Sequence, residues 1–191
     1  MTTTHQTYRH HPQLQALFKT AESRHLNDEE MRTYLSVVPD ETARAQAARE
    51  VKNVDGGVVK KTIKGIYEIY PYEQKHALAM AKCVRDVRYV TAYATMAMLM
   101  DDPDWFRDKL LVWMKTIIQS FRYPDIPEGT TRRLHSDPEI LAHLETLQPH
   151  QRSIYETYMS VKREIMASIS ETSAEIMEPF LQLPVDILAH D

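Results

Sequence analysis

Glycine and cysteine are scarce in this chain, which has four glycines and one cysteine among its 191 residues. Sheet-rich and turn-rich folds use more glycine, whereas the residues that favour helices, such as Ala, Leu, Met, Glu and Lys, are abundant throughout. The lone Cys83 excludes an internal disulfide, which suits the reducing cytoplasm. Composition and length together predict an all-α protein with one domain spanning residues 1–191.

Long apolar runs and a strong charge of one sign are also missing. The richest apolar stretch, Tyr93 to Met100, is far shorter than the roughly 20 residues that a membrane-spanning helix needs. No cationic leader with an apolar run precedes the first polar segment. The formal net charge of -4 gives no electrostatic reason to expect nucleic acid or anionic lipid as a partner. We therefore expect a cytoplasmic protein that can still dock on a membrane complex.

Signatures of catalysis and of metal binding are absent too. The sequence has no glycine-rich phosphate loop, nucleophile elbow or paired-carboxylate motif, so nothing in it indicates an enzyme. His5, His10 and His11 have an unspecific spacing, and Glu139 and His143 lack a third ligand. None of the nine histidines stands at a clearly apolar periodic position suited to an axial haem ligand. We expect neither a metal site nor haem.

Capping residues and prolines divide the first third of the chain into helices. The first dozen residues carry no periodicity and are predicted to be a flexible tail. Asn27 and Glu30 predict a capping box at the start of a helix that Pro39 ends. Asp40 is expected to cap the next helix. The run Asp-Gly-Gly at 55–57 then predicts either a break in that helix or a close approach of two backbones.

The second half of the chain follows the same logic. Asp102 and Pro103 predict the start of a helix with one apolar face, made of Phe106, Leu110, Trp113, Met114, Ile117 and Phe121. The segment from Arg122 to Thr131 is predicted to be a loop, and Asp137 to cap a short helix that Pro149 ends. Pro184 is expected to end the last helix.

Cys83 lies inside a long stretch without proline or glycine. It shares a helical face with Asp86, since the two are three positions apart. A thiolate can add to the ethylidene group of a linear tetrapyrrole, whose central pyrrole N–H groups can donate to a carboxylate. Arg85 or Lys82 would then pair with the propionates. On the residues alone, a half-buried helix position beside a surface ion pair is the commoner explanation.

Further residues give this segment a specific resemblance. Cys83, Arg85 and Asp86, with Tyr89 and Thr95 beyond them, are similar to the Cys-x-Arg-Asp motif of the phycocyanin and allophycocyanin family. Three segments upstream also resemble that family. Residues 24–31 are similar to its Arg-Tyr-Leu-x-x-x-Glu-Leu segment and residues 43–48 to its Ala-Arg-x-x-Ala-Ala run. Residues 53–59 are similar to its Asn-x-x-x-Ile-Val segment. The resemblance covers most of the chain.

The resemblance to phycobiliproteins implies a globin-like fold with two extra N-terminal helices, and a bilin bound to Cys83 by a thioether. Asp86 would organise the pyrrole nitrogens, Arg85 and Lys82 would hold the propionates, and Tyr89 would pack near the rings. It also implies a place at the cytoplasmic face of the thylakoid membrane. The partner would be a related subunit or a second copy, with phycobilisome or photosystem components beyond it.

The two N-terminal helices embrace the partner subunit in that family. Their apolar positions in this chain, which could also be ordinary core, are Leu14, Leu17, Phe18, Met31, Tyr34 and Leu35.

The chain also departs from the family. Residues 72–82 are shorter than the loop that covers part of the bilin in typical members, and their pattern is helical. Ala92 replaces a common arginine, Asp101 replaces the glycine of a Gly-Asp helix terminus, and residues 122–151 look like an insertion. Two functions therefore stay open: a bilin-binding light-harvesting protein, or a pigment-free structural or assembly factor for phycobilisome or photosystem complexes.

Overall fold

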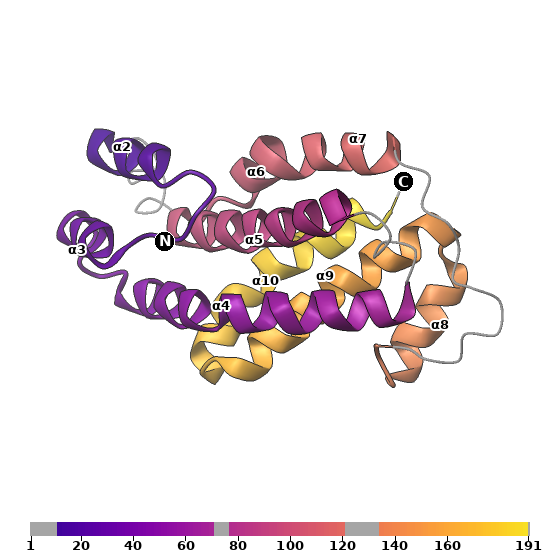
Figure 1. Cartoon of the computed structure of the whole chain (residues 1–191). Helices are drawn as coiled ribbons and strands as arrows, with labels where there is room; N and C mark the ends of the chain where they lie inside the picture. The colour runs from indigo at the N-terminus through magenta and orange to yellow at the C-terminus, as the bar shows by residue number, and fades with distance from the viewer. Residues whose placement is uncertain (1–10, 71–76, 121–133, 191) are drawn as a thin grey trace.

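The computed structural model describes residues 11–70, 77–120 and 134–190. Those residues form helices and the connections between them, and no strand occurs among them (Figure 1). The predicted all-α class is thereby confirmed. The predicted tail at residues 1–10 and the predicted loop at 122–131 lie outside the described residues, while Pro12 is already helical.

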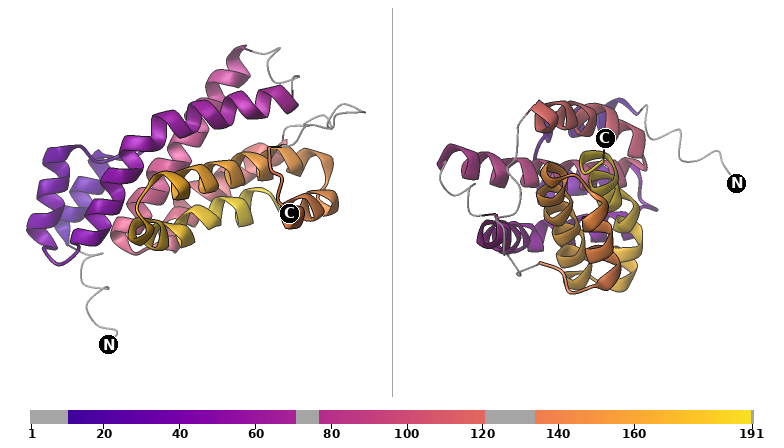
Figure 2. Two further views of the ribbon diagram at one scale, coloured as in Figure 1. Left: turned by 90° about the horizontal axis from the view of Figure 1, so that it is seen from below. Right: turned by 90° about the vertical axis from the view of Figure 1, so that its right-hand side faces the viewer.

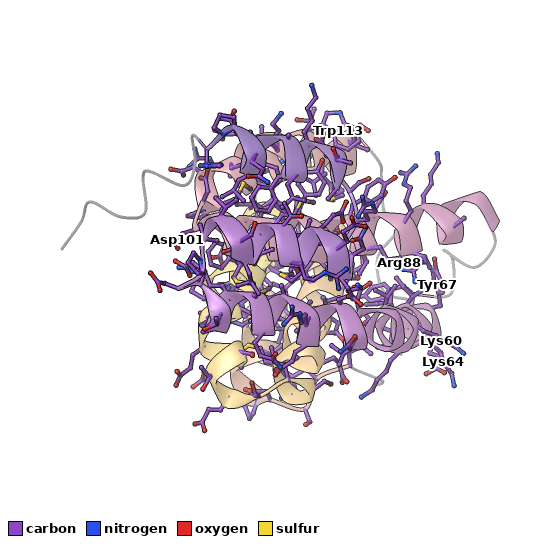
Figure 3. The ribbon with its side chains drawn as sticks, turned by 90° about the vertical axis from the view of Figure 1, so that its left-hand side faces the viewer. Lys60, Lys64, Tyr67, Arg88, Asp101 and Trp113 are labelled. Atoms are coloured by element: carbon purple, nitrogen blue, oxygen red, sulfur yellow. The ribbon has the colours of Figure 1, made fainter. Side chains whose placement is uncertain are left out.

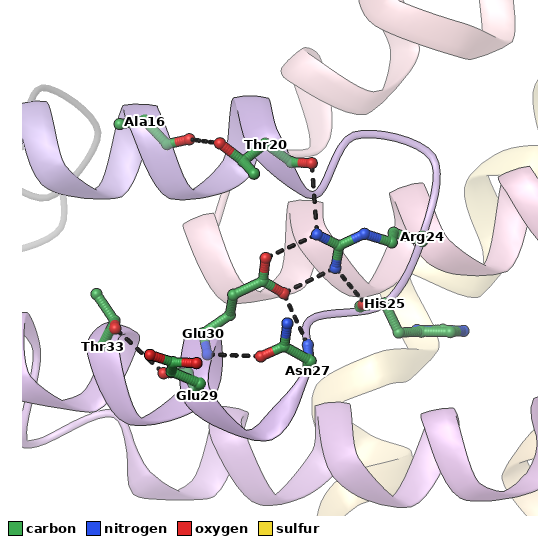
Figure 4. Close-up of polar contacts among 8 residues, drawn as sticks. All are labelled: Ala16, Thr20, Arg24, His25, Asn27, Glu29, Glu30 and Thr33. Atoms are coloured by element: carbon green, nitrogen blue, oxygen red, sulfur yellow. Dashed lines mark hydrogen bonds and ion pairs between the residues drawn. The ribbon is translucent and has the colours of Figure 1, made fainter.

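Two short helices, α2 (Pro12–Thr20) and α3 (Asp28–Val37), lie at one end of the molecule (Figure 1). The capping box predicted at the start of α3 is present. Asn27 accepts from the Glu30 backbone N–H at 2.9 Å, and the Glu30 carboxylate accepts from the Asn27 backbone N–H at 2.8 Å (Figure 4). Arg24 donates to both carboxylate oxygens of Glu30 at 2.7 Å, and this pairing lowers the pKa of Glu30. The connection between the two helices is therefore fixed.

The apolar side chains of α2 and α3 face the chain's own core. Phe18 and Tyr34 are in edge-on ring contact, and the Tyr34 hydroxyl donates to the Leu99 carbonyl at 2.9 Å. Of the six apolar positions considered for a partner contact, Leu35 is half-buried and five are buried: Leu14, Leu17, Phe18, Met31 and Tyr34. These side chains therefore contribute to the chain's own core, and a contact of α2 and α3 with a partner subunit stays a prediction.

The long helix α4 (Thr42–Ile69) runs without a break through the Asp-Gly-Gly run, which corrects the predicted interruption. A methyl group on Gly57 would meet nothing within 4 Å, and one on Gly56 would lie 3.8 Å from the Arg88 guanidinium. No close backbone approach therefore requires a glycine at either position. The helix starts after Glu41, so Asp40 does not cap it, and it ends just before Pro71.

Packing on both sides of the glycines explains why α4 continues. Asp55 is buried and accepts a hydrogen bond from the Thr91 hydroxyl of α5 (Ala77–Met100) at 2.6 Å, while Val58 and Val59 are buried one turn further on. Each glycine lowers helix stability by roughly 1 kcal/mol relative to alanine. Burial of the neighbouring side chains and the buried hydrogen bond outweigh that loss.

Helix α5 forms the centre of the core. Every residue from Val90 to Leu99 is buried, because α4 and α10 (Glu171–Leu188) pack against α5, and α9 (Pro149–Ser168) packs in turn on α4 and α10 (Figures 1 and 2). At its end, Asp101 has a φ of 52°, in the left-handed region that favours glycine. Arg44 holds it there through a 2.8 Å ion pair, so an aspartate occupies a backbone conformation that favours glycine.

A π-helical turn changes the apolar face that the sequence predicted after Asp102. The cap itself is as predicted, since Asp102 accepts from the Trp105 N–H at 2.8 Å. Between α6 (Pro103–Phe106) and α7 (Val112–Ser120), however, residues Arg107–Leu111 form a π-helix, whose wider turn rotates the following side chains. Leu111 is buried as a result, and the predicted core positions Trp113 and Ile117 are exposed. Phe121 lies outside the described residues.

One proline behaves differently from the prediction in the last helices. Asp137 caps α8 (Pro138–Thr146) as expected, and Pro149 begins α9. Pro184 lies inside α10, which continues to Leu188, so the predicted helix end is wrong. Pro184 itself is buried in the apolar face of α10, and that packing outweighs the backbone hydrogen bond that a proline removes.

The continuity of α4 can be tested at two of its glycines. Gly57→Ala should raise the free energy of unfolding by about 1 kcal/mol and the melting temperature by about 2–4 °C, because the added methyl meets open space in a regular helix. At the matched position Gly65, the methyl would approach the Leu134 side chain to 2.6 Å, so Gly65→Ala should gain less or destabilise. Urea unfolding of both variants measures the difference. A loss of stability in Gly57→Ala would mean that α4 is broken there.

Candidate functional site around Cys83

The N-terminal half of α5 carries all five residues that the sequence placed in a site. Lys82 and Arg85 are exposed, and Cys83, Asp86 and Tyr89 are half-buried. The helical repeat distributes them over two sides of α5. Cys83 and Asp86 turn toward α7 and α9, whereas Arg85 and Tyr89 turn toward α4 and the connection between α2 and α3.

Cys83 and Asp86 line one small hollow, as their spacing predicts. Its volume is about 80 Å³. The other walls are mainly apolar and come from α4, α7 and α9, with Ile63, Met114 and Tyr158 among the side chains. The hollow therefore combines a thiol and a carboxylate with apolar surroundings.

The Asp86 carboxylate is already paired on one side. Arg85 donates to Asp86 Oδ1 from Nε at 2.8 Å and from Nη2 at 2.7 Å, and these hydrogen bonds raise the pKa of Arg85. The guanidinium also lies 5.7 Å from the centroid of the Tyr89 ring, within cation–π distance. Arg85, Asp86 and Tyr89 thus form one cluster. Lys82 forms no ion pair with any residue that the structure describes.

The chemistry of these residues fits a linear tetrapyrrole, but the hollow that they line is too small to enclose one. The Cys83 thiol is half-buried and forms no disulfide, and Asp86 Oδ2 receives neither of the bonds from Arg85. Pockets that enclose a small molecule usually measure about 300–1,000 Å³, several times the volume of this hollow. A pigment on Cys83 would therefore lie largely outside the hollow.

Sequence reasoning missed one wall of this site. Met114 was expected on the apolar face of its helix, but Ile118 was not, and both line the hollow. The π-helical turn at Arg107–Leu111 brings Ile118 inward, and a period of 3.6 residues does not predict such a turn. Tyr158 of α9 is buried against the hollow.

Within the described ranges, no three His, Cys, Asp or Glu side chains come together as metal ligands. The His143 ring packs against Tyr155, with 4.8 Å between the ring centroids. His5 and His10 lie outside the described residues. No described helix is long and apolar enough to span a membrane.

Helical packing around α5, with two short helices at the start of the described chain, defines a globin-like all-α class of protein. A family model described as "Phycobilisome protein" matches residues 19–133, from the end of α2 to beyond α7 and thus more than half of the chain. The chain belongs to the phycobilisome protein family. None of the curated proteins matches it. Helices α8 to α10 lie beyond the matched segment.

The accessibility of Cys83 gives a direct test of this geometry. We expect iodoacetamide to alkylate the native protein, because the thiol is half-buried rather than enclosed. Asp86→Asn should speed the reaction a few-fold by removing a negative charge that disfavours the thiolate, and Arg85→Gln should slow it by removing a positive one. Mass spectrometry of timed samples gives the rates. A native protein that resists alkylation, or the reverse order of the two variants, would contradict this placement of the three side chains.

Proposed function

We propose that the protein is a light-harvesting member of the phycobilisome family and carries a linear tetrapyrrole on Cys83. The observation that carries the proposal is the shared hollow of Cys83 and Asp86, which puts the thiol and the carboxylate of the Cys-x-Arg-Asp motif on one side of α5. Members of this family generally carry bilins. Such a group, when bound, supplies the absorption of visible light.

Each polar residue of the motif has a separate task in this proposal. The Cys83 sulfur provides the covalent attachment. Asp86 Oδ2 would accept from pyrrole N–H groups while Oδ1 keeps its two hydrogen bonds from Arg85. Lys82, which is exposed, would pair with a propionate. Arg85 can bind the other propionate only with donors that Asp86 leaves free, and Tyr89 supports its guanidinium plane.

The second candidate is a pigment-free structural or assembly factor for phycobilisome or photosystem complexes. Two observations favour it: the hollow at Cys83 encloses only about 80 Å³, and Arg85 is already committed to Asp86. This candidate keeps the scaffold and the contacts with partners and needs no thioether. Both candidates place the protein with phycobilisome or photosystem components, and we propose that it works at the cytoplasmic face of the thylakoid membrane.

Attachment of a pigment separates the two candidates. When phycocyanobilin and a suitable lyase are supplied, the protein should acquire a pigment that survives denaturation, and Cys83→Ser should abolish zinc-enhanced fluorescence on a denaturing gel. Asp86→Asn should still be labelled but should absorb more weakly and at shorter wavelength, because the carboxylate that accepts from the pyrrole nitrogens is lost. Lys61→Gln, remote from the hollow, serves as the matched control. If the wild type stays unlabelled while a standard phycobiliprotein subunit is labelled in parallel, the pigment-free candidate is correct.

Contacts with other subunits need a surface that the chain leaves uncovered. Phycobiliproteins assemble into oligomers with other subunits. On α7, the large apolar side chains Val112, Trp113 and Ile117 are 51 %, 57 % and 37 % exposed. We propose that these three residues, the α7 patch, contact a related subunit or a second copy.

Substitution in the α7 patch should change the oligomeric state. Trp113→Glu with Ile117→Glu should shift the protein isolated from its host to a smaller species, because charge replaces apolar contact area. Light scattering coupled to size exclusion measures the mass, and circular dichroism checks the fold. Leu35→Glu on α3 is the matched control and should leave the mass unchanged. A smaller mass for the control alone would restore the N-terminal helices as the contact surface.

A further inference from the structure

A groove lies between α4 and α5, on the side of α5 that faces away from the hollow at Cys83. Its volume is about 730 Å³, and residues of both helices line it. Neither Cys83 nor Asp86 is among the described residues that line it. A second groove of about 700 Å³ shares Gly56, Val84 and Arg88 with it and continues toward His25.

The floor of the groove is apolar. Val59, Ile63 and Tyr67 succeed one another at intervals of four residues and therefore form one stripe along α4. All three are buried, with 2 %, 6 % and 5 % of their surface exposed. Val84 closes the floor from α5. This surface can contact an aliphatic or conjugated ligand, but it offers few hydrogen-bonding partners for a sugar.

The rim of the groove is cationic. Lys60 and Lys64 lie one helical turn apart on α4, and Arg88 faces them from α5; all three are exposed. Figure 3 shows these side chains and Tyr67 together along one edge of the molecule, away from Trp113. None of the three cations forms an ion pair with a described residue, in contrast to the neighbouring Lys61, which reaches Glu164 at 2.6 Å.

The charge of the groove differs from that of the whole protein. The chain has a formal net charge of -4, yet the groove is lined by one carboxylate, Glu68, and by three cations that pair with no described residue. Glu68 lies at the end of the wall, one turn beyond Lys64. From Gly56 to Glu68 the α4 wall extends over about 18 Å, at roughly 1.5 Å per residue. The groove therefore suits an elongated anion better than a compact one.

We propose that the α4–α5 groove binds, without a covalent bond, an elongated apolar molecule that carries carboxylate groups. The apolar body would cover the stripe of Val59, Ile63 and Tyr67, and the carboxylates would pair with Lys60, Lys64 and Arg88. The volume lies within the range of about 300–1,000 Å³ that is usual for small-molecule sites. A long-chain fatty acid and a free linear tetrapyrrole share this chemistry. The proposal does not rest on attachment at Cys83, which lines the other side of α5.

Calorimetric titration of the full chain tests the proposal, with Cys83→Ser in every variant so that no pigment can attach covalently. The two probes are palmitate, an aliphatic monocarboxylate, and biliverdin, a linear conjugated dicarboxylate. At least one should bind. Lys60→Gln with Lys64→Gln should weaken binding roughly tenfold or more, and Arg88→Gln should have a similar effect, because each change removes a charge-assisted hydrogen bond to a carboxylate.

Lys61→Gln is the matched control, since Lys61 is a neighbouring lysine on α4 that does not line the groove. It should leave the affinity unchanged, and circular dichroism should show the same helix content in all variants. Binding of palmitate alone would identify an aliphatic ligand, and binding of biliverdin alone a tetrapyrrole. The proposal is overturned if neither probe binds, or if the Lys60, Lys64 and Arg88 variants bind as tightly as the control.

Discussion

One buried hydrogen bond holds the two longest described helices in register. Thr91 of α5 donates to Asp55 of α4 at 2.6 Å, and the two residues are 0 % and 6 % exposed. His25, between α2 and α3, lies 3.7 Å from the other carboxylate oxygen of Asp55. A buried carboxylate destabilises a fold unless it is hydrogen-bonded, so this contact fixes both the rotation of α5 and its position along α4.

The rotation of α5 decides what each side of that helix can do. Cys83 and Asp86 face the hollow toward α7 and α9, and Val84 and Arg88 face the groove toward α4. A turn of α5 by one residue would move all four side chains out of these surroundings, since neighbouring positions on a helix are about 100° apart. The proposed pigment on one side and the proposed free anion on the other therefore depend on the same packing of α4 against α5.

Short-range signals in the sequence were reliable. The capping box of Asn27 and Glu30 and the cap at Asp102 involve residues three positions apart, so a local pattern determines them. Membership of the phycobilisome family, indicated by the motif at Cys83, is confirmed as well. The features that the sequence did not predict depend on contacts between residues far apart in the chain. The partner of Asp55 lies 36 positions away, so the Asp-Gly-Gly run looked like a break in α4.

The candidate site shows the same division between local and long-range information. Its polar residues follow from a four-residue motif, whereas the size of the hollow and the exposure of Trp113 depend on a π-helical turn and on packing by α9. The pairing of Arg85 with Asp86 is local, but its effect on the site depends on how much room surrounds Asp86. The motif therefore predicts which polar groups surround Cys83, but it does not predict whether the pocket there is enclosed.

The most direct test of the account is a double-mutant cycle across the contact that joins α4 to α5. The free energy of unfolding would be measured by urea denaturation for the wild type, Asp55→Ala, Thr91→Val and the double variant. The account predicts a coupling free energy of about 1.5–3 kcal/mol, the range for a hydrogen bond to a charged group. A coupling near zero would contradict it, since α4 and α5 would then be held in register by something other than the Asp55–Thr91 hydrogen bond.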